Sequence, residues 1–258
     1  MSSYFFRFLS FIKYFFTAKN EHSIHAPFLY ELYTKCIKID FIGPQFTALE
    51  AIRKSLLKNS EQISVSDFGT GTKSHKTIKD IAAKSLILPK YARLQYRLID
   101  KFKPNCILEL GTSLGISSAY FSLAAPQAKI YTLEGSKSIL EMAKHLHQQL
   151  GVSNIEYTEG NFDDTLPVLL NKLKYIDYVY IDGNHRKTPT LAYFKWILPH
   201  VHENTVMIVD DIYWSAEMNE AWKETIENDK VTLSLDFYRF GVVFFSKNLS
   251  KEHFVLRY

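Results

Sequence analysis

The feature that most constrains the fold is residues 106–121, CILELGTSLGISSAYF, in which an apolar strand-like run enters a glycine loop that opens a helix. Gly111 and Gly115 bracket the turn, and no helix breaker follows until Pro126. Glycine tolerates unusual backbone angles and lets a ligand approach the main chain closely, and the first N–H groups of a helix attract anions. The stretch therefore predicts a loop that binds a nucleotide-like ligand.

The strand after this loop ends in an acid. Residues 129–134, KIYTLE, place Glu134 about 20 residues beyond Gly111, where a carboxylate can accept both hydroxyls of a ribose. The dinucleotide fingerprint G-x-G-x-x-G differs, because this chain has Ser113 and Ile116 in place of the second and third glycines. The pattern predicts a ribose-containing ligand and disfavours a nicotinamide.

A second glycine loop, residues 66–72 (SDFGTGT), resembles the first. The next strand-like run, residues 85–89, contains no acid, so the loop at Gly69 and Gly71 lacks the partner that ribose binding requires. We expect a structural or lid loop there, and a role on the substrate side is the alternative.

Helical and strand-like segments alternate regularly beyond residue 137. Such alternation is typical of parallel β-α-β units with right-handed crossovers. Residues 231–247 differ, because two strand-like runs meet around 239–241 without room for a helix between them. We expect a doubly wound, mostly parallel α/β sheet with an antiparallel pair at one edge. The expected elements are helices at 138–150, 165–173 and 188–198, and strands at 155–158, 176–181 and 205–209.

Composition and the first 90 residues set the remaining limits. The 258 residues are 47% hydrophobic, which supports a large core. The net charge is only +4 and no dense basic tract is interleaved with aromatics, so we expect no nucleic-acid partner. Cys36 and Cys106 lie far apart, which argues against a disulfide framework and favours the cytoplasm. Residues 1–90 look helical and irregular, and we expect an N-terminal helical cap ahead of a catalytic domain at 91–258.

Residues 4–16, YFFRFLSFIKYFF, are strongly aromatic. A membrane-spanning helix needs about 20 apolar residues, and this run is shorter, is interrupted by Arg7 and Lys13, and shows no signal-peptide cleavage pattern. On a helix, Arg7, Ser10 and Thr17 would lie opposite an apolar face. That face would carry Phe5, Phe8, Leu9, Ile12, Phe15 and Phe16. We expect the helix to pack on its own domain or on a partner subunit of a homo-oligomer, and peripheral membrane contact is the alternative.

On these motifs, residues from about 91 to 247 resemble class I S-adenosylmethionine-dependent methyltransferases, in particular their divalent-metal-dependent O-methyltransferase branch. The resemblance implies a Rossmann-like methyltransferase fold with a seven-stranded sheet and S-adenosylmethionine as the methyl donor. It implies that residues 109–115 (ELGTSLG) cradle the methionine part, that Glu134 holds the ribose and that residues 160–162 contact the adenine. The cofactor-binding residues that we expect are Glu109, Gly111, Thr112, Ser113, Gly115, Glu134, Gly135, Asn161, Phe162 and Asp182.

Two strand ends carry acids, in residues 180–185 (YIDGNH) and 207–212 (MIVDDI). Both follow apolar runs, so Asp182, Asp210 and Asp211 should emerge together at the carboxyl edge of adjacent strands, beside the cofactor site. A hard divalent cation relieves the repulsion among converging carboxylates, and the resemblance implies metal ligands at these positions. We expect Mg²⁺, with Ca²⁺ or Mn²⁺ as alternatives. A single such acid could equally be a helix cap or a satisfied strand-end residue.

His185 stands three residues after Asp182, where catechol- and caffeoyl-type members carry a lysine and some sugar-modifying members a histidine. A neutral histidine can take a proton from a substrate hydroxyl. We expect metal-assisted O-methylation of a small-molecule hydroxyl, with His185 and Asp182 as catalytic residues. The alternatives are an exposed loop histidine, a cofactor-binding protein without turnover, and a metal-independent N- or C-methyltransferase. Trp214, Met218 and Trp222 either shape the acceptor pocket or belong to the core.

Overall fold

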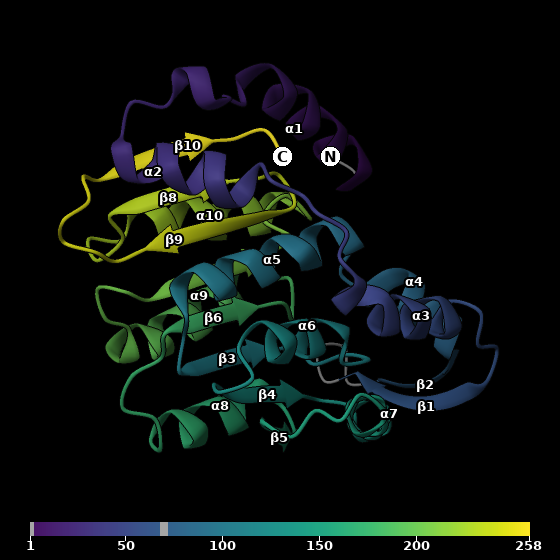
Figure 1. The fold of residues 1–258 in the computed structure, drawn as a ribbon. Coiled ribbons are helices and arrows are strands. Elements are labelled where there is room, and N and C mark those ends of the chain that lie inside the picture. Colours follow the sequence, from purple (N-terminus) through teal and green to yellow (C-terminus); the bar gives the residue numbers. More distant parts are fainter. Residues whose placement is uncertain (1–2, 68–71) are drawn as a thin grey trace. The chain divides into compact units, whose positions relative to one another are not determined.

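The computed structural model describes residues 3–67 and 72–258, and the chain divides into two compact units (Figure 1). One unit is residues 39–166, and the other combines residues 1–38 with residues 167–258. Neither boundary of these units falls at residue 90. The expected division into a cap at 1–90 and a catalytic domain at 91–258 stays a prediction.

The unit of residues 39–166 contains the glycine loop. Its three strands pair in parallel in the order β3-β4-β5, with Leu108 opposite Tyr131 and Leu133 opposite Thr158. Parallel strands that are covered on both faces read as continuous apolar runs, and β3 is buried over nearly its whole length. The elements are α3 (Thr47–Leu56), α4 (Ile78–Ser85), α5 (Pro89–Phe102), β3 (Cys106–Leu110), α6 (Ile116–Ala124), β4 (Lys129–Glu134), α7 (Lys137–Gln149) and β5 (Ile155–Glu159). The helix α8 (Phe162–Leu170) begins in this unit and ends in the other.

Two strands occur in the segment that was expected to be helical. β1 (Gln62–Asp67) and β2 (Thr72–Thr77) pair antiparallel, with Val65 opposite Ser74. Val65 is buried in an apolar cluster with Ile78, Leu114 and Ile139, which anchors the hairpin on the glycine-loop side of this unit. The segment that was expected to be helical and irregular thus also contains a hairpin, because short β-branched runs such as residues 62–67 carry a strand signal that is easily missed among helices. The glycines of the second loop, Gly69 and Gly71, lie outside the described residues.

The other unit holds the second half of the strand-helix alternation. Its strand order is β10-β8-β9-β7-β6, with β6 parallel to β7, and β9 antiparallel to both β7 and β8. The expected antiparallel pair is confirmed as β8 and β9, which meet around residues 237–239, although β10 and not this pair forms the edge. The bounds are β6 (Tyr178–Ile181), α9 (Lys187–Ile197), β7 (Val206–Asp210), α10 (Ala216–Glu227), β8 (Leu233–Asp236), β9 (Phe240–Phe244) and β10 (Glu252–Val255).

The strand β10 was not expected. It pairs in parallel with β8, so these five strands together with β3, β4 and β5 make eight, where the resemblance implied seven. The α/β class and the mostly parallel strands with antiparallel members are confirmed.

The N-terminal segment packs against the C-terminal strands (Figure 1). α1 (Ser3–Thr17) is followed by a bridge between Lys19 and Leu256, and the Tyr14 hydroxyl donates to the Leu256 carbonyl at 2.6 Å. After it, α2 (Pro27–Leu32) contributes buried leucines, and Phe28 contacts Phe244 edge-on. Among the described residues, the longest apolar helices fall short of what crossing a membrane requires.

Candidate functional site

The glycine loop joins β3 to α6 in a left-handed backbone path. Gly111, Ser113 and Gly115 have φ angles of 105°, 47° and 80°. A Cβ atom at residue 115 would come within 2.8 Å of the His147 imidazole, so both the backbone angle and the packing require glycine there. The backbone angles of the loop thus agree with the prediction of a tight turn with a glycine at each end.

Glu134 lies across this loop. Its carboxylate accepts the backbone N–H of Ser113 at 3.0 Å and that of Ser136 at 2.9 Å, and the N–H of Gly135 also contributes. Burial raises the pKa of the Glu134 carboxyl, and these N–H groups oppose the shift. A carboxylate has about four lone-pair positions, so beside the three N–H groups about one acceptor position remains, enough for one hydroxyl of a ribose. The structure brings together Glu134, Gly135, Ser113 and both glycines, as the sequence predicted.

Glu109 and Thr112 face the interior. Glu109 is fully buried, and its carboxylate accepts hydroxyl hydrogen bonds from Ser117 at 2.5 Å, from Thr132 at 2.6 Å and from Ser118. Burial raises the pKa of Glu109 to about 7, although the three hydroxyls lower it. Thr112 places its Oγ1 2.6 Å from that of Thr132. Both side chains therefore support the loop from the protein interior. Direct contact of Glu109 and Thr112 with a cofactor stays a prediction.

The expected adenine contacts, Asn161 and Phe162, stand at the start of α8. Asn161 Oδ1 accepts the N–H of Asp163 at 3.3 Å, which caps the helix, and the Phe162 side chain is half-buried. This cap explains why α8 begins at Phe162, earlier than the predicted residue 165. Gly160, just before it, has a φ of 134°.

His147 supports the loop and was missed by the sequence analysis. Its Nε2 lies 2.7 Å from the Gly115 carbonyl oxygen and its Nδ1 lies 2.9 Å from the Tyr157 hydroxyl. A carbonyl only accepts, so Nε2 carries the hydrogen and Nδ1 accepts from Tyr157. Burial lowers the pKa of His147 to about 4. The available signal was weak, because a histidine on the apolar face of a predicted helix is most often part of the core.

The unit of residues 1–38 and 167–258 contains an acidic cluster. Ligand atoms of Asp182, His185 and Asp211 all lie within 4.8 Å of one another. His185 Nε2 is 3.7 Å from an Asp182 oxygen, and its Nδ1 is 3.7 Å from an Asp211 oxygen. Burial raises the pKa of both carboxyls, and the neighbouring negative charges raise it further. β6 presents the first acid at its end, and the turn after β7 presents Asp211 with a left-handed φ of 54°.

Asp210 takes a different position from the other two acids. Its side chain is 2% exposed, accepts the Tyr180 hydroxyl at 2.7 Å and caps the N–H of Asp211 at 2.8 Å. The Tyr180 hydroxyl oxygen also lies 3.0 Å from Asp182 Oδ2, so this one group links the two strand ends. Asp210 therefore has structural partners of its own, whereas His185 lies beside Asp182 and Asp211.

Arg239 is a second residue that the sequence analysis missed. Its Nε lies 3.4 Å from Asp210 and its guanidinium reaches Asp211 at 3.1 Å. The acids raise the pKa of Arg239 against the opposing effect of burial. The residue comes from the turn of the antiparallel pair, so its place beside the acids depends on how β9 pairs with β7.

An aromatic group borders the cluster. The Trp214 ring is 43% exposed, lies 6.2 Å from the His185 ring and is covered on one side by the Arg7 guanidinium at 4.6 Å. Met218 and Trp222 are buried in the core, as the plainer of the two expectations had it. Of the three residues considered for an acceptor pocket, Trp214 is the one next to the cluster.

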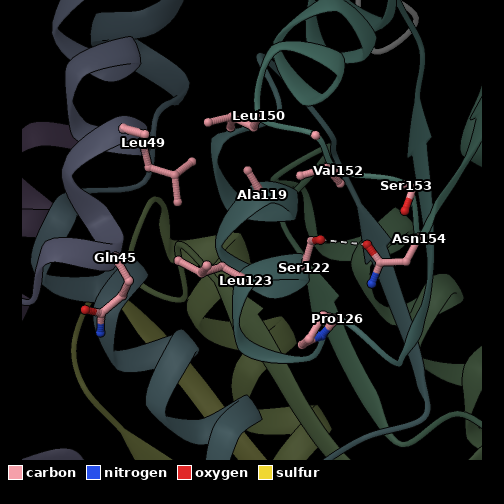
Figure 2. Close-up of a pocket in the computed structure, with 12 residues that line it drawn as sticks. Gln45, Leu49, Ala119, Ser122, Leu123, Pro126, Leu150, Val152, Ser153 and Asn154 are labelled. Carbon is pink, nitrogen blue, oxygen red and sulfur yellow. Dashed lines mark hydrogen bonds between the residues drawn. The ribbon is translucent and has the colours of Figure 1, made fainter.

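A pocket of about 370 Å³ lies elsewhere in the unit of residues 39–166 (Figure 2). It is lined by α3, α6 and the turn after α7, and includes none of the predicted site residues. Two of its polar side chains are hydrogen-bonded within the protein, since the Ser122 hydroxyl donates to Asn154 Oδ1 at 2.6 Å and the Asn154 amide donates to the Ala125 and Ala128 carbonyls.

Residues 108–212 match the profile of a family described as a methyltransferase domain, a span that includes both the glycine loop and the acidic cluster. The chain carries a methyltransferase domain. This confirms the resemblance to class I S-adenosylmethionine-dependent methyltransferases and the predicted enzyme class. A comparison with curated proteins found no match.

Solved structures agree with the fold of this methyltransferase. The O-methyltransferase from Bacillus cereus in complex with SAH is 16% identical, with a TM-score of 0.60 over 84% of this chain and 96% of that one. The O-methyltransferase TomG from Streptomyces achromogenes, in complex with SAM, is 20% identical, with a TM-score of 0.58 over 80% and 100%. The SAH-bound methyltransferase PaMTH1 from Podospora anserina is 17% identical, with a TM-score of 0.58 over 81% and 100%. The Rossmann-like methyltransferase fold is therefore confirmed.

Proposed function

We propose that this methyltransferase transfers a methyl group from S-adenosylmethionine to a hydroxyl oxygen of a small molecule, and that a divalent cation at the acidic cluster assists. The observation that carries the metal assignment is the convergence of ligand atoms from Asp182, His185 and Asp211 within 4.8 Å. Two of these residues were expected as ligands from the sequence, and the third was expected as the proton acceptor.

The charges of the cluster fit a divalent cation. When ionised, Asp182, Asp210 and Asp211 carry three negative charges, and Arg239 supplies one positive charge. The remainder of two negative charges in a largely buried group is what one divalent cation neutralises. The carboxylate oxygens suit Mg²⁺, Mn²⁺ or Ca²⁺. Bound there, the cation would supply a Lewis acid that lowers the pKa of a substrate hydroxyl and orients it.

The donor side of the proposal rests on Glu134 and the loop. Glu134 is held by three backbone N–H groups and keeps about one acceptor position for a ribose hydroxyl of S-adenosylmethionine. Gly111 and Gly115 adopt left-handed backbone angles. Because glycine has no Cβ atom, a ligand can approach the main chain closely at both positions. S-adenosylmethionine supplies the electrophilic methyl group. In the transfer, the carbon–sulfur bond breaks as the oxygen–carbon bond forms, and the hydroxyl proton must go to a base.

His185 is the base that we assign on the acceptor side. Its two ring nitrogens face carboxylates, each at 3.7 Å, so an imidazolium formed by proton uptake would be stabilised by both Asp182 and Asp211. A ring nitrogen whose lone pair binds a cation cannot accept a proton at the same time. His185→Gln separates the two roles, because loss of a base lowers turnover at saturating metal, whereas loss of a ligand is offset by raising the metal concentration.

A metal-independent transfer is the second candidate, and Arg239 is the observation that favours it. The guanidinium already compensates part of the acidic charge, and protonation of one buried carboxyl would reduce the remainder. In that case the cluster would position a nitrogen or carbon acceptor without a cation.

The test is a transfer assay with tritium-labelled methyl donor, pooled hydroxyl compounds, and chelator with or without added Mg²⁺, Mn²⁺ or Ca²⁺. We expect labelled product that disappears with chelator and returns with one of the cations. Asp211→Asn should abolish product formation, and Asp229→Asn, an exposed acid outside the cluster, should not. Activity that is indifferent to both chelator and Asp211→Asn would support the metal-independent candidate. Donor binding by calorimetry without transfer to any compound would support a non-catalytic binding protein.

A further inference from the structure

The helix α1 is attached to the protein by its polar face. The Ser3 hydroxyl donates to the Trp214 carbonyl at 2.9 Å, and the Tyr14 hydroxyl donates to the Leu256 carbonyl at 2.6 Å. Between them, the Arg7 guanidinium lies over the Trp214 ring, and the Arg7 carbonyl accepts the Tyr238 hydroxyl at 2.7 Å. At 100° per residue, Ser3, Arg7 and Tyr14 fall within one narrow arc of the helix.

The opposite face of α1 is apolar and exposed. No residue of the helix is buried. The arc from Tyr4 through Phe8 to Leu9 contains only apolar or aromatic side chains, with Lys13 at its border. Its members are Tyr4 at 83% exposure, Phe5 at 50%, Phe8 at 61%, Leu9 at 43%, Ile12 at 38%, Phe15 at 57% and Phe16 at 78%. This reverses the usual orientation of an amphipathic helix on a protein, in which the apolar face is turned inward, so packing of that face on its own domain is wrong.

The charges around this face select the partner. From Ser3 to Asn20 the chain contains no acid, and it contains Arg7, Lys13 and Lys19. Lys13 and Lys19 are exposed, and Arg257 adds a further cation next to Phe15, at 5.9 Å from its ring. Aromatic rings beside cations are the composition of helices that lie in the interface of an anionic lipid bilayer. The helix is about 22 Å long at 1.5 Å per residue, which suits lying in that interface and not crossing it.

We propose that the apolar face of α1 docks on an anionic lipid surface and holds the protein there as a peripheral membrane protein. A second copy of the chain would cover the apolar side chains equally well, but it would bring the same cations together across the contact. Anionic headgroups, by contrast, complement Lys13, Lys19 and Arg257. The proposal is independent of the methyl transfer proposed above, since it concerns no residue of the loop or of the acidic cluster.

The test is sedimentation of the full-length protein with vesicles, without methyl donor or acceptor. We expect binding to phosphatidylcholine vesicles that contain one third phosphatidylglycerol, and much weaker binding to pure phosphatidylcholine. Phe8→Ser with Phe16→Ser should lower the affinity at least tenfold. The matched control is Leu88→Ser with Val168→Ser, which removes two apolar side chains of similar exposure outside α1 and should leave binding unchanged.

A charge series gives a second, independent readout. Each cation near an anionic surface contributes about fivefold in affinity, so Lys13→Glu, which changes the charge by two, should weaken binding roughly 25-fold. Lys172→Glu, on an exposed position outside α1, should have little effect. All variants replace exposed side chains, and unchanged circular dichroism and melting temperature would show that they fold.

Two results would overturn the proposal. One is failure of the unmodified protein to sediment with the anionic vesicles. The other is a dimer in analytical ultracentrifugation that Phe8→Ser with Phe16→Ser converts to a monomer, while vesicle binding stays at the level of the pure phosphatidylcholine control. That result would assign the face to a second copy of the chain.

Discussion

The Nε2 atom of His147 donates a hydrogen bond to the carbonyl oxygen of Gly115 at 2.7 Å. This contact joins a buried side chain of α7 to the last residue of the glycine loop, directly before α6 begins. Because Gly115 also has a left-handed φ and no room for a Cβ atom, loop geometry and helix packing depend on each other here.

Gly115→Ala should lower the free energy of unfolding by more than the strain of a left-handed alanine alone. That strain costs about 1–2 kcal/mol, and the added Cβ at 2.8 Å from the imidazole would displace His147. Gly151→Ala is the matched control, because Gly151 has a φ of 69° and nothing within 4 Å of the Cβ position. Urea denaturation of both variants measures the free energy of unfolding, and calorimetry measures their binding of the methyl donor. Equal losses of stability would show that contact with His147 does not restrict the loop.

His147 should make the protein less stable as the pH falls. Its pKa is lowered to about 4 in the folded state and is about 6.5 in the unfolded chain. Between these values only the unfolded chain takes up the proton, so stability that is present above pH 6.5 is lost progressively towards pH 4. The maximum loss is about 3 kcal/mol.

The comparison that isolates this effect is His147→Gln against His145→Gln, an exposed residue on the same helix. Unfolding free energies measured from pH 7.5 to 4.5 should show a shallower acid decline for His147→Gln than for the natural protein. The control should follow the natural protein, and parallel curves for all three would contradict the assignment.

Glu109 should act in the opposite direction. Its pKa rises to about 7 in the folded state, from an ordinary value of 4.5. The folded protein therefore binds this proton more tightly, and the stability it contributes is complete below pH 4.5 and lost as the pH rises through 7. Glu109→Gln, which keeps hydrogen-bonding groups without the charge, should gain relative to the natural protein by up to about 3 kcal/mol at pH 8. Glu159→Gln, at an exposed position of β5, should show no such trend in denaturation curves across that range.

Arg239 should stabilise the protein in the absence of metal. Removing one partner of a buried charge pair costs about 3–5 kcal/mol, and discounting for the one-third exposure of the Arg239 side chain leaves about 2 kcal/mol for Arg239→Gln. Thermal melting with chelator should report this loss, and added Mg²⁺ should recover more stability in the variant than in the natural protein. Lys187→Gln, which removes a surface pair with Glu220 and Glu224, should change the melting temperature little and respond to Mg²⁺ like the natural protein.

Local patterns were sufficient for much of the fold. The strand-loop-helix of residues 106–121, the alternation beyond it and the antiparallel pair all follow from periodicity and turn residues, which are properties of neighbouring residues. The hairpin of β1 and β2 and the strand β10 were missed, because short strands at the ends of a fold give a weak signal and depend on pairing with distant partners.

The glycine loop is the part of the site that the sequence by itself determined. Gly111 and Gly115 mark it through the backbone angles that glycine allows, and the spacing to Glu134 predicts the acid at the end of the next strand. Only the tertiary structure decided which side chains support that loop and the acidic cluster. His147 approaches from α7, Arg239 from the turn between β8 and β9, and α1 attaches through its polar face. Such placements follow from how separate elements pack, and no local pattern in the chain encodes them.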